Sequence, residues 1–194
     1  MSWEEATAKV KGERLSRSEL QAHHGYNRHI RTAVHEAGHA LFTFYAGGYV
    51  KWAYITARNG GLCEWTDKHA VDVALLPLIE RAGVVAEWLW MERHESLYAQ
   101  EHAVFELSTS LDSALFFESE SCAEYAVSKE QWATLEAFFT RHYDEVVALG
   151  RLIYRRWKHP RKGDSIYSED IQAITGKNLF TDIRPNLRRD GTVA

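Results

Sequence analysis

The chain has 194 residues, a length typical of one domain, and 45% of them are hydrophobic, as in ordinary globular proteins. Its 23 basic and 27 acidic residues give a net charge of −4, which provides no general attraction to nucleic acid or to an anionic membrane. The two cysteines lack paired spacing, the N-terminus lacks the apolar stretch of a signal peptide, and charges interrupt the most apolar window. We therefore expect a soluble, cytoplasmic protein without a membrane span.

The N-terminal third of the chain predicts two helical segments. Residues 1–27 are polar and charged with weak helical periodicity, and we expect them to form an N-terminal helical arm. From about residue 28, apolar residues recur at helical spacing. Gly47 and Gly48 end this pattern, as glycines do after a helix C-terminus.

Residues 50–57 and 62–66 predict two short strands, because the first is rich in aromatic and β-branched residues. Asn59 and Gly60 lie between them, and an Asn-Gly pair is a strong signal for a hairpin turn. The sequence therefore predicts one β-hairpin.

The remainder of the chain predicts helices. One follows Asp67 and runs to about Arg93, and Pro77 either kinks this helix or marks a break in it. Hydroxyl side chains at residues 108–110 are suited to capping a helix that begins at Leu111.

Residues 128–131 (SKEQ) resemble a capping box, and they predict one long helix that reaches about Lys158. A short helix is expected over residues 168–174, closed by Gly176. The predicted organisation is an arm (1–27), one domain (28–180) and a loose tail (181–194). We predict a mainly α-helical fold with a small β-hairpin sheet, of the α+β class.

The strongest chemical motif is the HExxH sequence formed by His35, Glu36 and His39. On a helix, positions i and i+4 share a face, so both imidazoles can reach one metal ion. Zinc lowers the pKa of a bound water molecule to about 7, and a neighbouring carboxylate can take up its proton. The motif therefore predicts a zinc site with Glu36 as general base.

Ten histidines in the chain raise the chance that such a motif arises by accident on a surface helix. The flanking residues Ala33, Val34, Ala37 and Leu41 are small or apolar, which indicates that this helix is buried. Buried histidine and glutamate need polar partners, and a metal ion would supply them. We therefore favour a metal site.

A catalytic zinc ion usually takes three protein ligands, so a further residue is required. The elongated form of the motif would need Gly at 42 and His at 45, but these positions hold Phe42 and Tyr45. The third ligand must come from farther along the chain, where the candidates are Glu80, Glu87, His94, His102, Asp112 and Glu118.

The sequence resembles the peptidase domain of FtsH-type ATP-dependent zinc proteases over about residues 28–176. Residues 32–41 (TAVHEAGHAL) look like the active-site helix of that family, and residues 55–66 are similar to its IxPRG…LGYT hairpin. Residues 82–87 fall where the family has GGRAAEE, and residues 110–112 (SLD) resemble its SND. Residues 143–147 and 168–171 are weakly similar to its C-terminal helices.

The resemblance implies a zincin-type fold and zinc-dependent hydrolysis of peptide bonds, with Asp112 as the third zinc ligand and Glu87 as the reserve. It also implies a polypeptide substrate, which we expect to add as an extended strand to the edge of the hairpin. The sequence contains no GxxxxGK[ST] motif, so we expect a freestanding peptidase domain that acts without ATP on flexible chains.

Three alternatives accompany this prediction. A degenerate peptidase could serve as a zinc-stabilised interaction or regulatory module, and Ala57 and Cys63-Glu64 depart from the family hairpin in its favour. Cys63 as a metal ligand, as in peptide deformylases, would have to precede the HExxH helix, but it follows it. The basic run over residues 151–162 suggests either contact with nucleic acid or a partner or, as we favour, cations opposing a helix dipole. The sequence names neither the natural substrate nor the oligomeric state.

Overall fold

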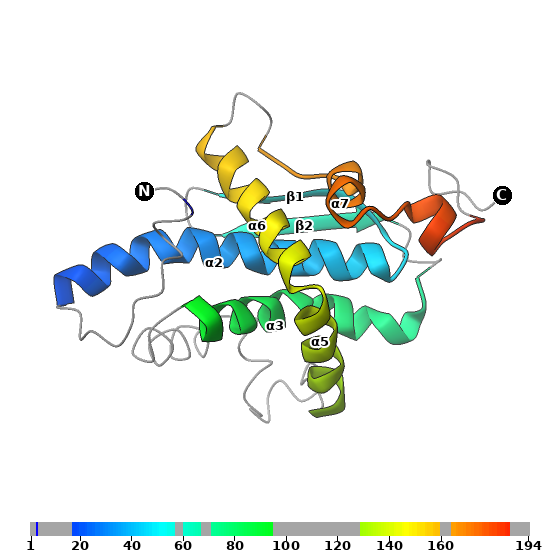
Figure 1. Ribbon diagram of the computed structural model, residues 1–194, viewed down its shortest axis with the longest axis horizontal. Coiled ribbons are helices and arrows are strands. Elements are labelled where there is room, and N and C mark those ends of the chain that lie inside the picture. Colours follow the sequence, from blue (N-terminus) through cyan, green and yellow to red (C-terminus); the bar gives the residue numbers. More distant parts are fainter. Residues whose placement is uncertain are drawn as a thin grey trace.

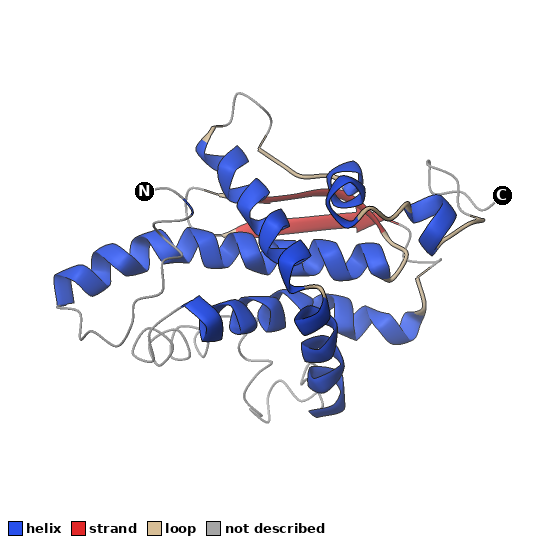
Figure 2. Ribbon diagram, viewed as in Figure 1, coloured by secondary structure: helices blue, strands red, loops and turns tan. Residues whose placement is uncertain are grey.

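A computed structural model describes residue 3 and residues 17–56, 60–66, 71–94, 129–159 and 164–186. This part of the chain is mainly helical with one two-stranded antiparallel sheet, which confirms the predicted α+β composition (Figure 2). In chain order the elements are α2 (Arg17–Tyr45), β1 (Tyr49–Ile55), β2 (Gly61–Thr66), η1 (Val73–Leu75), α3 (Leu76–His94), α5 (Lys129–Arg141), α6 (Tyr143–Lys158), α7 (Ser168–Thr175) and a π-helical turn, η5 (Leu179–Ile183).

Helix α2 is the centre of the fold. It lies between the hairpin and α3, while α6 crosses it (Figure 1). Because it has neighbours on several sides, nearly every residue from 30 to 44 is buried, which is the pattern of a core helix and not of a surface helix. The predicted boundary near residue 27 falls inside α2, so the end of the arm and the helix of the HExxH motif are one continuous element.

The C-terminus of α2 is fixed by the predicted glycines. Gly47 has a φ of 90°, which a residue with a side chain rarely adopts, and the Gly48 amide donates to the Thr43 carbonyl at 2.9 Å. This is a Schellman arrangement, which satisfies a carbonyl group at the helix end. Arg184 donates from Nη1 to the Gly47 carbonyl at 3.0 Å, so the beginning of the expected tail is attached to this corner.

The predicted hairpin is confirmed, with β1 and β2 paired antiparallel from Tyr49–Thr66 to Ile55–Gly61. The turn residues 57–59 lie outside the described part of the chain. On its other edge β1 forms an antiparallel bridge between Ala53 and Ile166, with hydrogen bonds of 2.9 and 2.8 Å. Strand β1 is therefore paired on both edges, by β2 and by the segment that leads into α7.

Pro77 neither kinks nor breaks α3. It occupies the first turn of that helix, where the backbone N–H has no intrahelical partner and proline is well tolerated. The preceding turn η1 is capped by Asp72, whose side chain accepts from the Ala74 amide at 2.9 Å. The helix predicted from Leu111 lies outside the described residues.

The prediction of one long helix up to Lys158 was wrong, because the chain forms two helices, α5 and α6, separated at His142. His142 has a non-helical ψ of 25°, and its Nδ1 lies 3.0 Å from the Glu145 carboxylate. Its ring also packs on Phe138 and Tyr45, with centroids 4.6 Å away in both cases. These contacts stabilise a bend that lets α5 pack on α3 while α6 crosses α2.

The predicted short helix is confirmed as α7, and Gly176 closes it with a φ of 67°. Among the described helices, none has the length and apolar character needed to cross a membrane.

Small residues allow α2 and α3 to approach closely. A Cβ atom on Gly38 would lie 2.6 Å from the Ala86 Cβ and 2.9 Å from the Ala82 carbonyl oxygen, far inside van der Waals contact. The two helices therefore pack backbone against backbone at this point, and α3 brings its main chain to the HExxH face of α2.

We expect Gly38→Ala to destabilise the protein by about 1–3 kcal/mol, because the added methyl group overpacks this contact. Alanine normally stabilises a helix by about 1 kcal/mol relative to glycine, so a loss of stability would identify the steric effect. The free energy of unfolding from urea titrations measures it. Gly60→Ala is the control, because its nearest atom would lie 3.5 Å away. Equal stability of Gly38→Ala and the parent chain would contradict the close-packing interpretation.

Candidate metal centre

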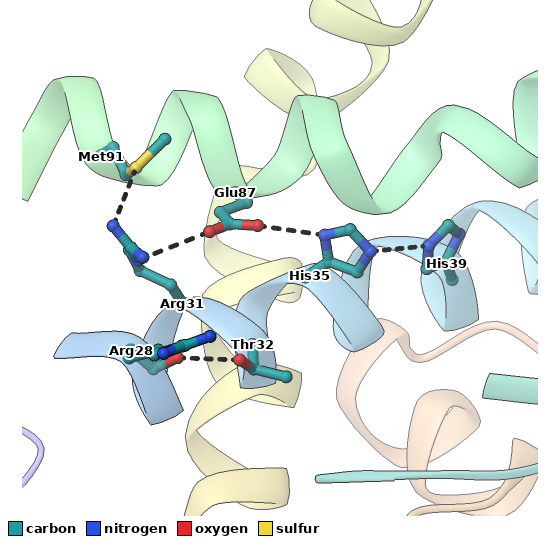
Figure 3. Close-up of polar contacts among 7 residues, drawn as sticks. All are labelled: Arg28, Arg31, Thr32, His35, His39, Glu87 and Met91. Carbon is teal, nitrogen blue, oxygen red and sulfur yellow. Dashed lines mark hydrogen bonds and ion pairs between the residues drawn. The ribbon is translucent and has the colours of Figure 1, made fainter. Parts of the chain in front are cut away.

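The two histidines of the HExxH motif face each other on α2. Their Nε2 atoms are 3.1 Å apart, and their ring planes are inclined at 69° (Figure 3). His35 is buried and His39 is partly buried, so neither ring is freely hydrated. The structure therefore brings these two predicted ligands together, with one nitrogen of each directed at the same point.

The opposite nitrogen of each ring is held by α3. The Nδ1 atom of His39 lies 2.8 Å from the Ile79 carbonyl oxygen, and that of His35 lies 3.0 Å from Glu87 Oε2. A carbonyl oxygen and a carboxylate can only accept, so both Nδ1 atoms carry the proton. In a neutral imidazole the Nε2 atom then presents a lone pair.

Two such lone pairs repel each other unless a cation lies between them. Tetrahedral zinc with Zn–N bonds of about 2.0–2.1 Å would place its nitrogens about 3.3 Å apart, close to the observed 3.1 Å. Histidines that bind metals almost always donate their other N–H to a carboxylate or a backbone carbonyl. The pair is therefore fitted to hold a metal ion, or a proton in its place.

Gly83 leaves the space that the imidazoles need. A Cβ atom at this position would collide with His39 Nε2 and would lie 2.6 Å from His35 Cδ2. The positions Ile79, Gly83 and Glu87 are four residues apart, so they form one face of α3 opposite the histidines. Ile79 contributes its backbone carbonyl to this face, Gly83 leaves room for the imidazoles, and Glu87 contributes its carboxylate.

Glu36 lies on another side of α2, beside strand β2. Its carboxylate occupies the space where a Cβ atom of Gly61 would be, and only 6% of the residue is exposed. Burial, and then the charge of Glu36, raise the pKa of the Cys63 thiol well above its ordinary value, which is consistent with Cys63 lying near this carboxylate. The predicted general base therefore lies between the face of α2 that carries the two histidines and the hairpin.

The candidates for the third ligand have different positions. Glu80 is exposed and pairs with Arg81, and His94 stacks on Trp90 about 16 Å along the α3 axis from Gly83. Glu87 contacts the Nδ1 side of His35, so it supports a ligand and does not face the Nε2 atoms. Asp112, His102 and Glu118 lie outside the described residues. Within the described ranges, no group of three His, Cys, Asp or Glu side chains forms a metal cluster.

The sequence did not reveal several residues of this site. The Ile79 carbonyl has no side-chain signature, and Arg31, which contacts Glu87, precedes the motif by one helical turn. Gly83 and Gly61 fall within the segments that resemble the family, but the sequence did not indicate that their missing side chains make room for the imidazoles and for Glu36. The available signal was the spacing of residues 79, 83 and 87 on one helix face, which marks a surface that faces a neighbouring helix.

Part of the basic run has a structural role. Arg156 on α6 makes a bidentate ion pair with Asp170 on α7, with distances of 2.6 and 2.7 Å, and also donates to the Ser165 carbonyl. This contact ties α7 to α6 and does not require an anionic partner. Arg161 and Lys162 lie outside the described residues.

Comparisons of the chain with protein-family models, with curated proteins and with solved structures found no match.

We expect Gly83→Ala to weaken zinc binding by about tenfold or more, because the new methyl group must displace the imidazoles or α3. Chelator competition in solution measures the affinity, and circular dichroism checks that helix content is retained. Gly60→Ala should bind as the parent chain does, because among the described residues its added Cβ would meet only Thr56 Oγ1, at 3.5 Å. Unchanged affinity in Gly83→Ala would mean that the two rings do not bind zinc in the observed arrangement.

Proposed function

We propose that this protein is a zinc-dependent metalloendopeptidase of the HExxH type, with a zincin-type domain similar to the FtsH peptidase domain. The observation that carries the proposal is the pair of Nε2 atoms 3.1 Å apart, with both Nδ1 atoms engaged by α3. Both Nδ1 atoms donate to α3, which leaves the Nε2 atoms as the nitrogens with lone pairs. At 3.1 Å these two atoms are close enough to bind the same cation.

In the proposed mechanism His35 and His39 hold the metal together with Asp112, as the family resemblance implies. A zinc ion supplies Lewis acidity, which polarises a peptide carbonyl and makes hydroxide available near neutral pH. Glu36 accepts the proton of the attacking water and delivers it to the leaving amine nitrogen. Glu36 is buried and adjacent to His35 in the sequence, which suits this role. The same carboxyl group must first accept a proton and then donate it, both times close to the reacting bond.

The hairpin suggests how a substrate would bind. One edge of β1 is bridged to Ile166, and the outer edge of β2 has no strand partner among the described residues. Gly61 at the start of β2 contacts the Glu36 carboxylate region. An extended peptide that pairs with β2 would therefore pass close to the base.

Only a chain without stable structure can add as a strand in this way. The sequence has no P-loop, so this chain does not use that motif to unfold a substrate with ATP. A folded domain is stable by about 5–15 kcal/mol, and its open population is too small to feed a peptidase efficiently. We propose flexible or unfolded polypeptides as the substrate class, cleaved without ATP.

We expect about one zinc ion per chain after expression with zinc, as measured by elemental analysis. His35→Ala, His39→Ala and Asp112→Ala should each lose most of the metal, because each removes a ligand. His94→Ala is the matched control, since this histidine stacks on Trp90 away from the pair. Absence of zinc from the parent chain would overturn the proposed function. Loss of zinc in Glu87→Ala but not in Asp112→Ala would overturn the choice of third ligand.

We expect Glu36→Gln to keep its zinc and its fold but to cleave casein about 10²–10⁴-fold more slowly, because the proton acceptor is gone. Glu80→Gln, an exposed glutamate on α3, serves as control and should cleave normally. A tightly folded domain should resist the parent chain, with or without ATP. Normal turnover by Glu36→Gln would contradict the assigned role. Zinc binding without any cleavage by the parent chain would favour the alternative, a regulatory module that binds polypeptides.

A further inference from the structure

Arg31 lies one helical turn before His35 on α2 and is buried, with 6% of the residue exposed. Its Nε atom is 3.5 Å from Glu87 Oε1, and its Nη1 atom is 3.9 Å from the Met91 sulfur. The other oxygen of the same carboxylate, Glu87 Oε2, accepts from His35 Nδ1 (Figure 3). Arg31, Glu87 and His35 therefore form a continuous chain of charge and hydrogen bonding that ends at the metal-binding face.

The two histidines are supported in different ways. His39 donates to the Ile79 carbonyl, a backbone group that the α3 helix itself holds in place. His35 donates to a carboxylate at the end of a side chain with three rotatable bonds. The orientation of His35 therefore depends on what holds the Glu87 carboxylate, and Arg31 is a charged group in contact with its other oxygen.

A simple structural account would make Arg31 and Glu87 a buried ion pair and nothing more. Such pairs are costly to desolvate, and well-packed apolar residues often replace them without loss of stability. The division of the two carboxylate oxygens between Arg31 and His35 indicates a different role. Because Oε1 lies 3.5 Å from Arg31 Nε and Oε2 lies 3.0 Å from His35 Nδ1, the two contacts together restrict the orientation of the carboxylate that faces the imidazole.

We propose that Arg31 is a positioning residue for the metal centre: through Glu87 it holds His35 in the Nδ1–H tautomer, so that Nε2 presents its lone pair to zinc. The consequence for zinc rests on the proposed function, but the consequence for the tautomer does not. Arg31 touches neither the substrate nor the metal in this proposal, and it acts only through the carboxylate.

The test combines two measurements on Arg31→Met. Imidazole nitrogen NMR of the metal-free protein should show His35 changing from the Nδ1–H tautomer to a mixture, while His39 is unchanged. Zinc affinity from chelator competition should fall about 10–100-fold, the usual effect of losing an outer-shell partner. Arg81→Met is the matched control, because the Arg81 side chain is equally buried (6% against 7%) and pairs with Glu80. It should alter neither measurement.

A double-mutant cycle tests whether Arg31 acts through Glu87. Glu87→Met should weaken zinc binding, and adding Arg31→Met to it should cause no further loss, because the intermediary is already absent. Should Arg31→Met fail to fold, Arg31→Lys takes its place in the cycle, since it keeps the charge but not the shape of the contact. Additive losses would overturn the proposal, as would an unchanged His35 tautomer in the variant.

The two hypotheses fail separately. If the parent chain binds no zinc but His35 still loses its tautomer in Arg31→Met, the metallopeptidase proposal falls and the positioning role of Arg31 stands. If the parent chain binds zinc and neither tautomer nor affinity responds to Arg31→Met, the positioning role falls and the metal centre stands.

Discussion

The close contact between α2 and α3 is the constraint on which the rest of this structure depends. Gly38 on one helix meets Ala82 and Ala86 on the other, and no larger residue fits at that crossing. At this separation a backbone carbonyl of α3 reaches a side chain of α2, as Ile79 does with His39. Wider packing would leave both histidines to be oriented by longer side chains or by water, with less geometric control.

The polar groups at this interface are compatible with burial because each is matched across the two helices. Arg31 and His35 on α2 oppose Glu87 on α3, and His39 opposes Ile79, so the same four-residue spacing runs along both helices. Desolvation of charged and polar side chains is unfavourable unless they are paired, and here pairing also fixes their direction. Within the histidine pair, the two Nε2 atoms lie on the other side of the rings and face each other at 3.1 Å.

Local sequence signals accounted for much of the fold. The Asn-Gly signal between the predicted strands, the glycines after residue 46 and Gly176 at the end of α7 are local patterns of a few adjacent residues, so they could be recognised without tertiary context. The break at His142 could not. Buried residues at 135, 139, 146, 149 and 153 keep a helical period across it, so periodicity predicts one helix where tertiary contacts produce two. The motif identified His35, Glu36 and His39, but the role of Glu87 depends on which ring nitrogen it meets, and the assignment of Asp112 stays a prediction.

The geometry of α2 separates two tasks that the proposed chemistry requires. Residues 35 and 39 are about 40° apart around the helix axis, whereas residue 36 is about 100° from residue 35. The histidines therefore contact α3, and Glu36 contacts the start of β2.

On the α3 side, the contacts determine how firmly the two proposed ligands are held. On the hairpin side, they determine where an extended chain would lie relative to the base. Because the base and the histidines lie on one buried helix but contact different elements, a shift of the hairpin is expected to change where a bound chain lies relative to Glu36. A shift of α3 is expected to change how the two imidazoles are held. Metal retention and peptide positioning are therefore expected to respond to different substitutions, even though their residues are adjacent in the sequence.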